Sequence, residues 1–175
     1  MNGTGDALLI DGRYRVLEKL GEGGMGSVYK VEHVRMGKVA AVKVMRADAV
    51  QDRALTARFL QEARVVARLS HPNTVQVFDS GELPSGGLYM AMEYVPGKDL
   101  AWHLRNFGPM KEERAVSIAV QVLKSLQEAH EAGIVHRDIK PANIMLVRRR
   151  KSGEEQVKLL DFGIAKLQES EGRKS

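Results

Sequence analysis

The chain has 175 residues, of which 43% are hydrophobic and 28% are charged. This composition is typical of a soluble globular protein and excludes the disordered, collagenous and disulfide-scaffold classes. The absence of cysteine excludes a disulfide framework, a thiolate nucleophile and a cysteine-ligated metal centre, and it fits a cytoplasmic location. No apolar run approaches the roughly 20 residues that span a bilayer, and we expect no secretory signal at the N-terminus.

The 27 lysines and arginines exceed the 22 aspartates and glutamates, which gives a net charge of +5. Four of the positive charges are adjacent, in the run Arg-Arg-Arg-Lys at residues 148–151. A single short basic run is more typical of a solvated loop than of a nucleic-acid footprint, which needs more basic surface. We therefore expect no nucleic-acid partner. The competing hypothesis is a salt-sensitive site for nucleic acid or an acidic partner at this run.

The N-terminal half of the chain is predicted to consist of strands with one helix. Phe59, Ala63, Val66 and Ala67 recur at helical spacing, which predicts a helix over residues 53–70. The proline of His71-Pro72-Asn73 disfavours further helix. Apolar and β-branched residues between glycine-containing turns predict strands near residues 14–17, 28–31, 39–44, 74–79 and 88–94.

Beyond Pro96-Gly97 the pattern becomes helical. Helices are expected near residues 100–106 and over 111–131, where apolar side chains keep a period of about 3.6 residues. Gly133 stands where a left-handed helix cap is expected. Two short strands are expected near residues 144–147 and 157–160.

The segment Gly21-Glu22-Gly23-Gly24-Met25-Gly26 lies between two predicted strands. Glycines at this spacing allow backbone N–H groups to approach phosphate oxygens, where a Cβ would interfere. Three glycines at this spacing also occur in ordinary hairpins, so the motif alone leaves a plain glycine turn open. A strand after the glycines, rather than a helix, argues against a dinucleotide-binding fold.

Lys43 ends the apolar run Val39-Ala40-Ala41-Val42-Lys43. A lysine inside an apolar strand is costly to bury unless it pairs with a negative charge. Phosphate oxygens or a carboxylate from the next helix would serve, and Glu62 is the candidate because it lies beside the predicted inward stripe. The alternative is an ordinary lysine whose stem covers apolar surface while its ammonium stays in water.

The segment His136-Arg137-Asp138-Ile139-Lys140-Pro141-Ala142-Asn143 is followed by Asp161-Phe162-Gly163. At this composition, His-Arg-Asp with asparagine five positions after the aspartate is expected by chance about 0.0004 times per chain. Buried polar residues that only cap turns are the structural alternative. The order of all the motifs along the chain favours catalysis.

In that order, the motifs resemble those of the eukaryotic-like Ser/Thr protein kinases, and the double glycine in the first motif is similar to that of prokaryotic members. The resemblance covers about Tyr14 to Lys166. It implies an α+β, two-lobe protein-kinase-like fold, with an antiparallel β small lobe carrying one helix and an incomplete, mainly helical large lobe. We expect an N-terminal extension over residues 1–13, the small lobe over 14–95 and part of the large lobe over 96–175.

The resemblance also implies an ATP-dependent protein kinase that transfers the γ-phosphoryl group of Mg-ATP to serine or threonine hydroxyls of a protein substrate. Asp138 is expected to orient the substrate hydroxyl and to accept its proton. Lys140 is expected to neutralise the γ-phosphate, while Asn143 and Asp161 are expected to hold Mg²⁺.

For the nucleotide, the resemblance implies contacts from several segments. Lys43, fixed by Glu62, is expected to hold the α- and β-phosphates. The backbone at Glu93 and Val95 is expected to meet the adenine edge, and Asp99 to reach the ribose. The other expected contacts are the loop residues Leu20, Gly21, Gly23, Gly24 and Gly26, the adenine roof Val28 and Ala41, the gatekeeper Met92 and the adenine floor Met145.

Only 12 residues follow Gly163, so the sequence lacks most of the activation segment and the later helices that hold a peptide substrate. We expect a truncated or partial copy of a longer kinase. The alternative is a short module that binds ATP or a partner without phosphotransfer. A small-molecule kinase of the aminoglycoside or choline type is disfavoured by the combination of Arg137 and Lys140.

Overall fold

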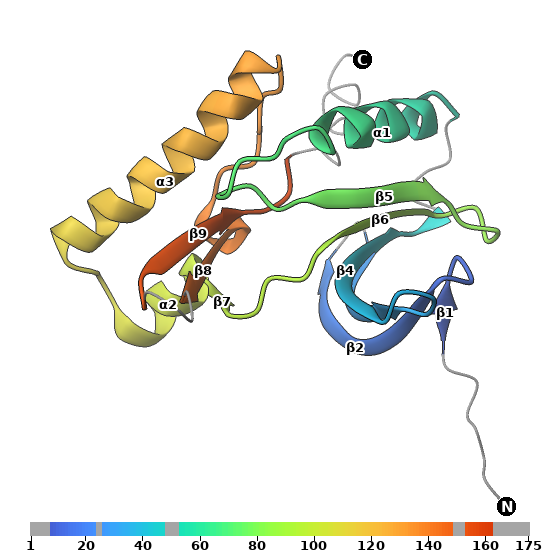
Figure 1. Ribbon diagram of the computed structural model, residues 1–175, viewed down its shortest axis with the longest axis horizontal. Helices are drawn as coiled ribbons and strands as arrows, with labels where there is room; N and C mark the ends of the chain where they lie inside the picture. The colour runs from blue at the N-terminus through green and yellow to red at the C-terminus, as the bar shows by residue number, and fades with distance from the viewer. Residues whose placement is uncertain (1–7, 24–25, 48–52, 149–152, 163–175) are drawn as a thin grey trace, which may run out of the picture. The chain divides into compact units, whose positions relative to one another are not determined.

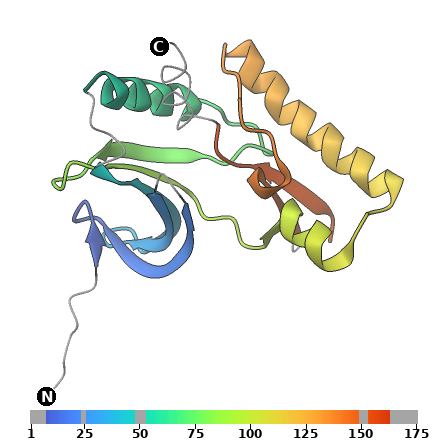
Figure 2. The same ribbon diagram turned by 180° about the vertical axis from the view of Figure 1, so that it is seen from behind.

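The computed structural model describes residues 8–23, 26–47, 53–148 and 153–162, which divide into two compact units (Figures 1 and 2). The first unit holds the residues up to Ala63 together with Val77–Tyr94. The second unit holds Arg64–Gln76 and the residues from Val95 onward. Among the described residues, no helix combines the length and the hydropathy needed to cross a membrane.

The first unit is built on a sheet of six strands. They are β1 (Leu9–Ile10), β2 (Tyr14–Gly23), β3 (Gly26–His33), β4 (Lys38–Met45), β5 (Val77–Glu82) and β6 (Leu88–Glu93). Their order in the sheet is β1-β2-β3-β4-β6-β5, and every neighbouring pair is antiparallel. Helix α1 (Arg53–Val66) follows β4 in the chain, with most of its residues in this unit.

Side chains of β4 alternate between the two faces of the sheet, because successive residues of a strand point to opposite sides. Ala40 and Val42 belong to an apolar cluster on one face, whereas Ala41 and Lys43 point to the other. The predicted apolar stripe of α1 is confirmed for Phe59, Ala63 and Val66, which are buried, whereas the fourth member, Ala67, is half-buried and lies beyond the end of the helix. The buried members of the cluster are Ile10, Tyr14, Val31, Ala40, Val42, Tyr89 and Ala91.

The second unit combines two helices with a small sheet. Its elements are β7 (Lys98–Asp99), α2 (Leu100–Phe107), α3 (Glu112–Glu131), the 3₁₀ turn η2 (Pro141–Asn143), β8 (Ile144–Arg148) and β9 (Glu155–Leu159). The three strands pair antiparallel in the order β7-β8-β9. Helix α3 ends as predicted, because Gly133 has a φ of 75° and the next residue, Ile134, donates its N–H to Ala129 O at 2.8 Å.

Helix α1 ends at Val66, four residues earlier than the sequence predicts. The reason lies on α3, where the carboxylate of Glu128 accepts hydrogen bonds from the backbone N–H groups of Ser70 and His71 at 2.9 and 3.0 Å. These N–H groups would otherwise continue the helix. A tertiary acceptor therefore replaces the helical one.

Strand β5 begins at Val77, three residues later than predicted. The preceding residues bond within the second unit instead. Thr74 Oγ1 shares a hydrogen bond of 2.7 Å with Ser125 Oγ on α3, and Val75 N donates to Leu159 O at 3.0 Å. Because Thr74 and Val75 form these hydrogen bonds with α3 and β9, they do not extend β5.

Candidate functional site

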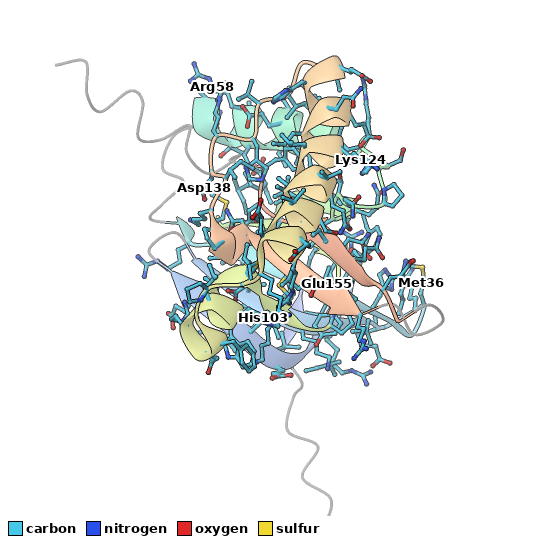
Figure 3. All side chains as sticks on the ribbon, turned by 90° about the vertical axis from the view of Figure 1, so that its left-hand side faces the viewer. Met36, Arg58, His103, Lys124, Asp138 and Glu155 are labelled. Atoms are coloured by element: carbon cyan, nitrogen blue, oxygen red, sulfur yellow. The ribbon has the colours of Figure 1, made fainter. Side chains whose placement is uncertain are left out.

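Three of the predicted catalytic residues lie together around one carboxylate. Lys140 Nζ is 2.8 Å from Asp138 Oδ2, and Asn143 Nδ2 donates to the same oxygen at 3.0 Å. Asn143 Nδ2 also donates to the backbone oxygen of Asp138 at 2.8 Å. The carboxylate is therefore held in one orientation by a cation and an amide. Figure 3 shows Asp138 in the second unit.

The turn η2 positions the amide of Asn143. Pro141 occupies the first position of this turn, where its missing N–H and fixed φ are tolerated. Asn143 N donates to Lys140 O at 2.9 Å, and Leu160 N donates to Asn143 O at 2.8 Å. Asn143 is only 6% exposed. Local turn chemistry and the chain after β9 thus fix this side chain together.

His136 anchors the start of the same loop and is 2% exposed. Asp138 N–H donates to its Nδ1 at 3.3 Å, so the ring proton must sit on Nε2, which then donates to Leu160 O at 2.8 Å. Burial lowers the pKa of His136 below its usual 6.5, although the Leu160 carbonyl and nearby aspartates oppose this shift. The side chain is therefore a neutral structural support.

The residues after β9 pack beside this histidine. Phe162 is buried, and its ring centroid lies 4.6 Å from that of His136. The preceding Asp161, a predicted metal ligand, has a φ of 45°, which non-glycine residues seldom adopt. The packing of Phe162 helps to hold this conformation. Gly163, the third residue of the motif, lies outside the described residues.

The predicted ribose and adenine-floor residues are direct neighbours in the second sheet. Asp99 on β7 lies opposite Met145 on β8 in the antiparallel register. Asp99 also caps α2, because its Oδ1 accepts a hydrogen bond from Trp102 N at 2.7 Å. One carboxylate oxygen of Asp99 is therefore used in capping the helix. The contact of Asp99 with ribose stays a prediction.

Four predicted nucleotide contacts share one face of the first sheet. Val28 on β3 lies opposite Lys43 on β4, and Ala41 on β4 lies opposite Met92 on β6. Directly opposite residues have side chains on the same face, as have residues two apart on one strand. Gly21 on β2 lies opposite Val28 and extends this row across the sheet.

The structural requirement for glycine differs among the positions of the glycine loop. Gly26 has a φ of 156°, and a Cβ on it would lie 1.9 Å from the backbone oxygen of Val44. The fold itself therefore excludes a side chain there. Gly21 and Gly23 do not have a φ in the glycine-favouring range, and a Cβ on either would meet no described atom within 4 Å. Gly24 lies outside the described residues.

The remaining predicted contacts come from both units. Leu20 is exposed on β2, and Glu93 is half-buried at the end of β6, opposite Ala40. Val95 is half-buried in the second unit. Glu62 is half-buried on α1, next to the buried Ala63, and its pairing with Lys43 stays a prediction.

Sequence reasoning assigned no role to the polar side chains of α3. Gln121, Ser125 and Glu128 stand at i, i+4 and i+7 and form one polar face of that helix, and Ser125 is fully buried. The sequence contains a signal for this face. Polar residues recur at helical spacing beside the apolar stripe, which indicates hydrogen bonding to another segment.

Oxygen donors characterise the second unit's candidate metal site. Asn143 uses Nδ2 as a donor to Asp138, so its Oδ1 is the atom that can serve a cation. Asp161 adds a carboxylate. Within the described ranges no group of three or more His, Cys, Asp or Glu side chains could hold a metal. This donor set fits a cation such as Mg²⁺, which takes few protein ligands and shares others with phosphates and water.

A profile of the protein kinase domain matches residues 14–175. The chain belongs to the protein kinase family. It is 46% identical over 158 residues to the serine/threonine-protein kinase pkn3 of Myxococcus xanthus and 42% identical over 160 residues to the serine/threonine-protein kinase PknB of Mycobacterium tuberculosis. Each alignment covers 90% of this chain. The predicted resemblance to prokaryotic Ser/Thr kinases is confirmed.

Solved structures agree with this assignment. A crystal structure of the PknI kinase domain of Mycobacterium tuberculosis matches with a TM-score of 0.77 and 36% identity over 90% of this chain. The predicted protein-kinase-like fold class is confirmed. The chain spans 29% of the length of pkn3, 25% of PknB and 62% of the PknI kinase domain. Kinases of this family generally use ATP and Mg²⁺.

Proposed function

We propose that this chain is the ATP-binding and catalytic part of a protein serine/threonine kinase, which transfers the γ-phosphoryl group of ATP to a serine or threonine hydroxyl of a protein. The single observation that carries the proposal is the position of Lys140 and Asn143, which both hold one oxygen of Asp138. Phosphoryl transfer needs little covalent work from the protein, so orientation and charge supply most of the rate enhancement.

Asp138 orients the substrate hydroxyl and accepts its proton as the phosphorus–oxygen bond forms. Fixing the carboxylate in advance avoids a loss of orientation at the moment of reaction. Lys140 neutralises negative charge on the transferred group. Its side chain is about half exposed, so it is open to solvent while it contacts Asp138.

Asn143 Oδ1 and the carboxylate of Asp161 hold Mg²⁺ in this proposal. The cation, when bound, neutralises charge on the phosphate oxygens. The burial of Asn143 and the packing of Phe162 against His136 support this assignment.

The first unit binds the nucleotide through the shared sheet face. Gly21 and Gly23 let backbone N–H groups approach the phosphates, and the open space around both positions supports this role. Lys43, paired with Glu62, holds the α- and β-phosphates. Val28 and Ala41 cover the adenine, and Met92 limits the depth of its pocket. The remaining contacts are proposed for Leu20, Gly24, Gly26, Glu93, Val95, Asp99 and Met145.

The protein substrate and a cytoplasmic location are parts of the same proposal. Lys140 two positions after Asp138 is the pattern of the Ser/Thr branch, and the relatives in the comparison are named serine/threonine-protein kinases. ATP is the phosphoryl donor inside cells. The absence of cysteine fits this location.

The test is transfer of labelled phosphate to a generic basic protein or to the kinase itself, by the chain and by a longer protein that contains it. Asp138→Ala should abolish transfer while Mg-ATP still raises the melting temperature. Transfer that persists in this variant contradicts the assignment of Asp138. A melting shift with Mg-ATP but no transfer by either form supports the alternative of a nucleotide-binding module.

A further inference from the structure

The two edges of the six-stranded sheet in the first unit are joined by polar side chains. The strand order places β1 and β2 at one edge and β6 and β5 at the other. Arg13 Nη1, just before β2, lies 3.0 Å from Oδ2 of Asp79 on β5. Because β3 and β4 lie between these strands in the sheet, the contact reaches from edge to edge. The cluster, called the edge clasp below, consists of Asp11, Arg13, Tyr14, Asp79 and Tyr89.

Curvature of the sheet brings these two edges together. Strand β2 has two register shifts against β3, and such bulges bend a strand and increase its twist. Figure 1 shows β2 as a strongly bent ribbon. The apolar cluster takes Ile10 and Tyr14 from one edge and Tyr89 and Ala91 from the other. The ring centroids of Tyr14 and Tyr89 lie 6.0 Å apart, so the sheet wraps around this cluster.

The turn between β1 and β2 carries two members of the edge clasp. Asp11 and Gly12 have φ values of 51° and 62°, and Arg13 N donates to Ile10 O at 3.2 Å. Positive φ at both central residues is the geometry of a type I′ turn, whose twist matches that of the flanking strands. Arg13 Nε donates to Asp11 Oδ2 at 2.8 Å across this turn. The turn thus fixes where the guanidinium lies.

Asp79 is the acceptor at the second edge. Its Oδ2 accepts from the Tyr14 hydroxyl at 3.0 Å, and its Oδ1 accepts from Ser80 N at 2.9 Å. The Tyr89 hydroxyl accepts from Arg13 and lies 3.1 Å from Asp79 Oδ2. Burial and then the charge of Asp79 raise the pKa of Tyr14 to about 12, so this hydroxyl is a donor at neutral pH. Charge-assisted hydrogen bonds therefore tie two buried tyrosines to both edges.

The strands that the edge clasp ties carry the proposed nucleotide contacts. Strand β2 runs from Tyr14 in the clasp to Gly21 and Gly23 at the proposed phosphate site. Strand β6 carries Tyr89 and ends at Glu93, the proposed adenine contact. Since β3 and β4 separate β2 from β6, ladder hydrogen bonds do not join these two described strands directly. The clasp supplies the direct link between them.

We propose that the edge clasp positions β2 relative to β6 and thereby preorganises the nucleotide site of the first unit. Its members are positioning residues, because none is among the proposed nucleotide contacts and they act through the strands. Preorganisation removes part of the entropic cost of binding, so disruption of the clasp weakens nucleotide binding. The inference rests on the proposed function, but the link between the edges is testable without nucleotide.

The first measurement is amide hydrogen exchange of the 175-residue chain without nucleotide. Arg13→Gln and Asp79→Asn should each speed exchange at least tenfold in both outer strands, β2 and β5, because each edge then opens more often. Exchange in the central strand β4 should change less than twofold. Arg15→Gln is the matched control, since Arg15 pairs at 3.5 Å with Glu32 on the neighbouring strand β3 and does not join the edges.

The second measurement is the dissociation constant for Mg-ATP, determined by calorimetry on the same variants. Arg13→Gln and Asp79→Asn should each weaken binding at least fivefold, whereas Arg15→Gln should change it less than twofold. The double variant should be no weaker than either single variant, because both remove one shared interaction. Circular dichroism at the assay temperature checks that each variant is folded, so the dissociation constant reports the folded chain.

Faster exchange at only one edge, equal effects of Arg15→Gln, additive losses in the double variant, or an unchanged dissociation constant each overturns the proposal. Both measurements are made at two chain concentrations tenfold apart, and an effect that depends on concentration also overturns a clasp within one chain. Absence of Mg-ATP binding by the unaltered chain refutes the proposed function instead. The exchange pattern then still decides whether the clasp joins the two edges.

Discussion

Lys140 Nζ lies 2.8 Å from Oδ2 of Asp138, and that oxygen also accepts a hydrogen bond from Asn143. The two donors fix the rotation of the carboxylate, although Lys140 itself is about half exposed. An exposed ion pair contributes little to stability. The contact is therefore better suited to orientation and charge balance during catalysis than to holding the fold.

Lys140→Met should lower kcat of phosphate transfer by roughly 10²- to 10³-fold, because a positioned charge near the reacting group is removed. The melting temperature should change little. Steady-state phosphate transfer, by the chain or a longer protein that contains it, measures this effect, with Lys124→Met as the exposed control on α3. A large loss of stability with unchanged kcat would show that Lys140 is structural.

Gly26→Ala should destabilise the first unit by several kcal/mol, on the order of 3, because a Cβ meets a backbone oxygen and the φ of 156° is strained. Gly21→Ala and Gly23→Ala should alter stability by less than about 1 kcal/mol. They should instead weaken ATP binding at least fivefold. Urea unfolding and nucleotide titration separate the two effects. Equal destabilisation by all three variants would contradict the assignment.

Glu128→Gln should lower the free energy of unfolding by roughly 1 kcal/mol, because charge-assisted hydrogen bonds to two backbone N–H groups weaken at a partly exposed site. Burial opposes the charge of Glu128, but the N–H groups of Ser70 and His71 outweigh it and hold its pKa below 4.5. Its stabilisation is therefore lost as pH falls through that lowered pKa. Glu131→Gln at the exposed end of α3 is the control, and an equal effect there would refute the role of Glu128.

Stability should also fall as the pH drops below 6.5 because of His136. Its pKa is lowered in the folded state, so below 6.5 the unfolded chain binds a proton that the folded chain does not. The stabilisation is present above pH 6.5 and lost as pH falls toward the folded pKa. His136→Gln should be less stable at pH 7 and should flatten this slope. Urea unfolding at several pH values measures it, and an unchanged slope would exclude His136 as the cause.

Much of the candidate site could be predicted because its residues are adjacent in the chain. Asp138, Lys140 and Asn143 stand within six positions, and a turn that starts at Pro141 brings them together by local geometry. The existence of a strand on each side of the glycine motif was also predictable from alternation and turn residues, although β2 extends to Gly23 and β3 begins at Gly26, beyond the predicted bounds. In each case, local sequence determines local structure.

Boundaries that depend on distant partners could not be predicted. The sequence extends α1 to residue 70, but Glu128, 58 residues away, takes the backbone N–H of Ser70. The sequence starts β5 at residue 74, but Thr74 bonds to Ser125 on α3. Secondary-structure propensity could not predict either partner, because the packing of α3 brings both Glu128 and Ser125 close to these segments.

The sequence by itself determined the family resemblance, the identity of the candidate catalytic residues and the type of chemistry they can perform. These follow from side-chain types at fixed spacing along one chain segment. Tertiary structure alone decided that His136 is neutral with its proton on Nε2, that Gly21, Val28 and Lys43 form one row, and that α2, α3 and β9 line one open pocket. The physical reason is that protonation, register and cavities depend on groups from distant segments, whose positions only the folded chain defines.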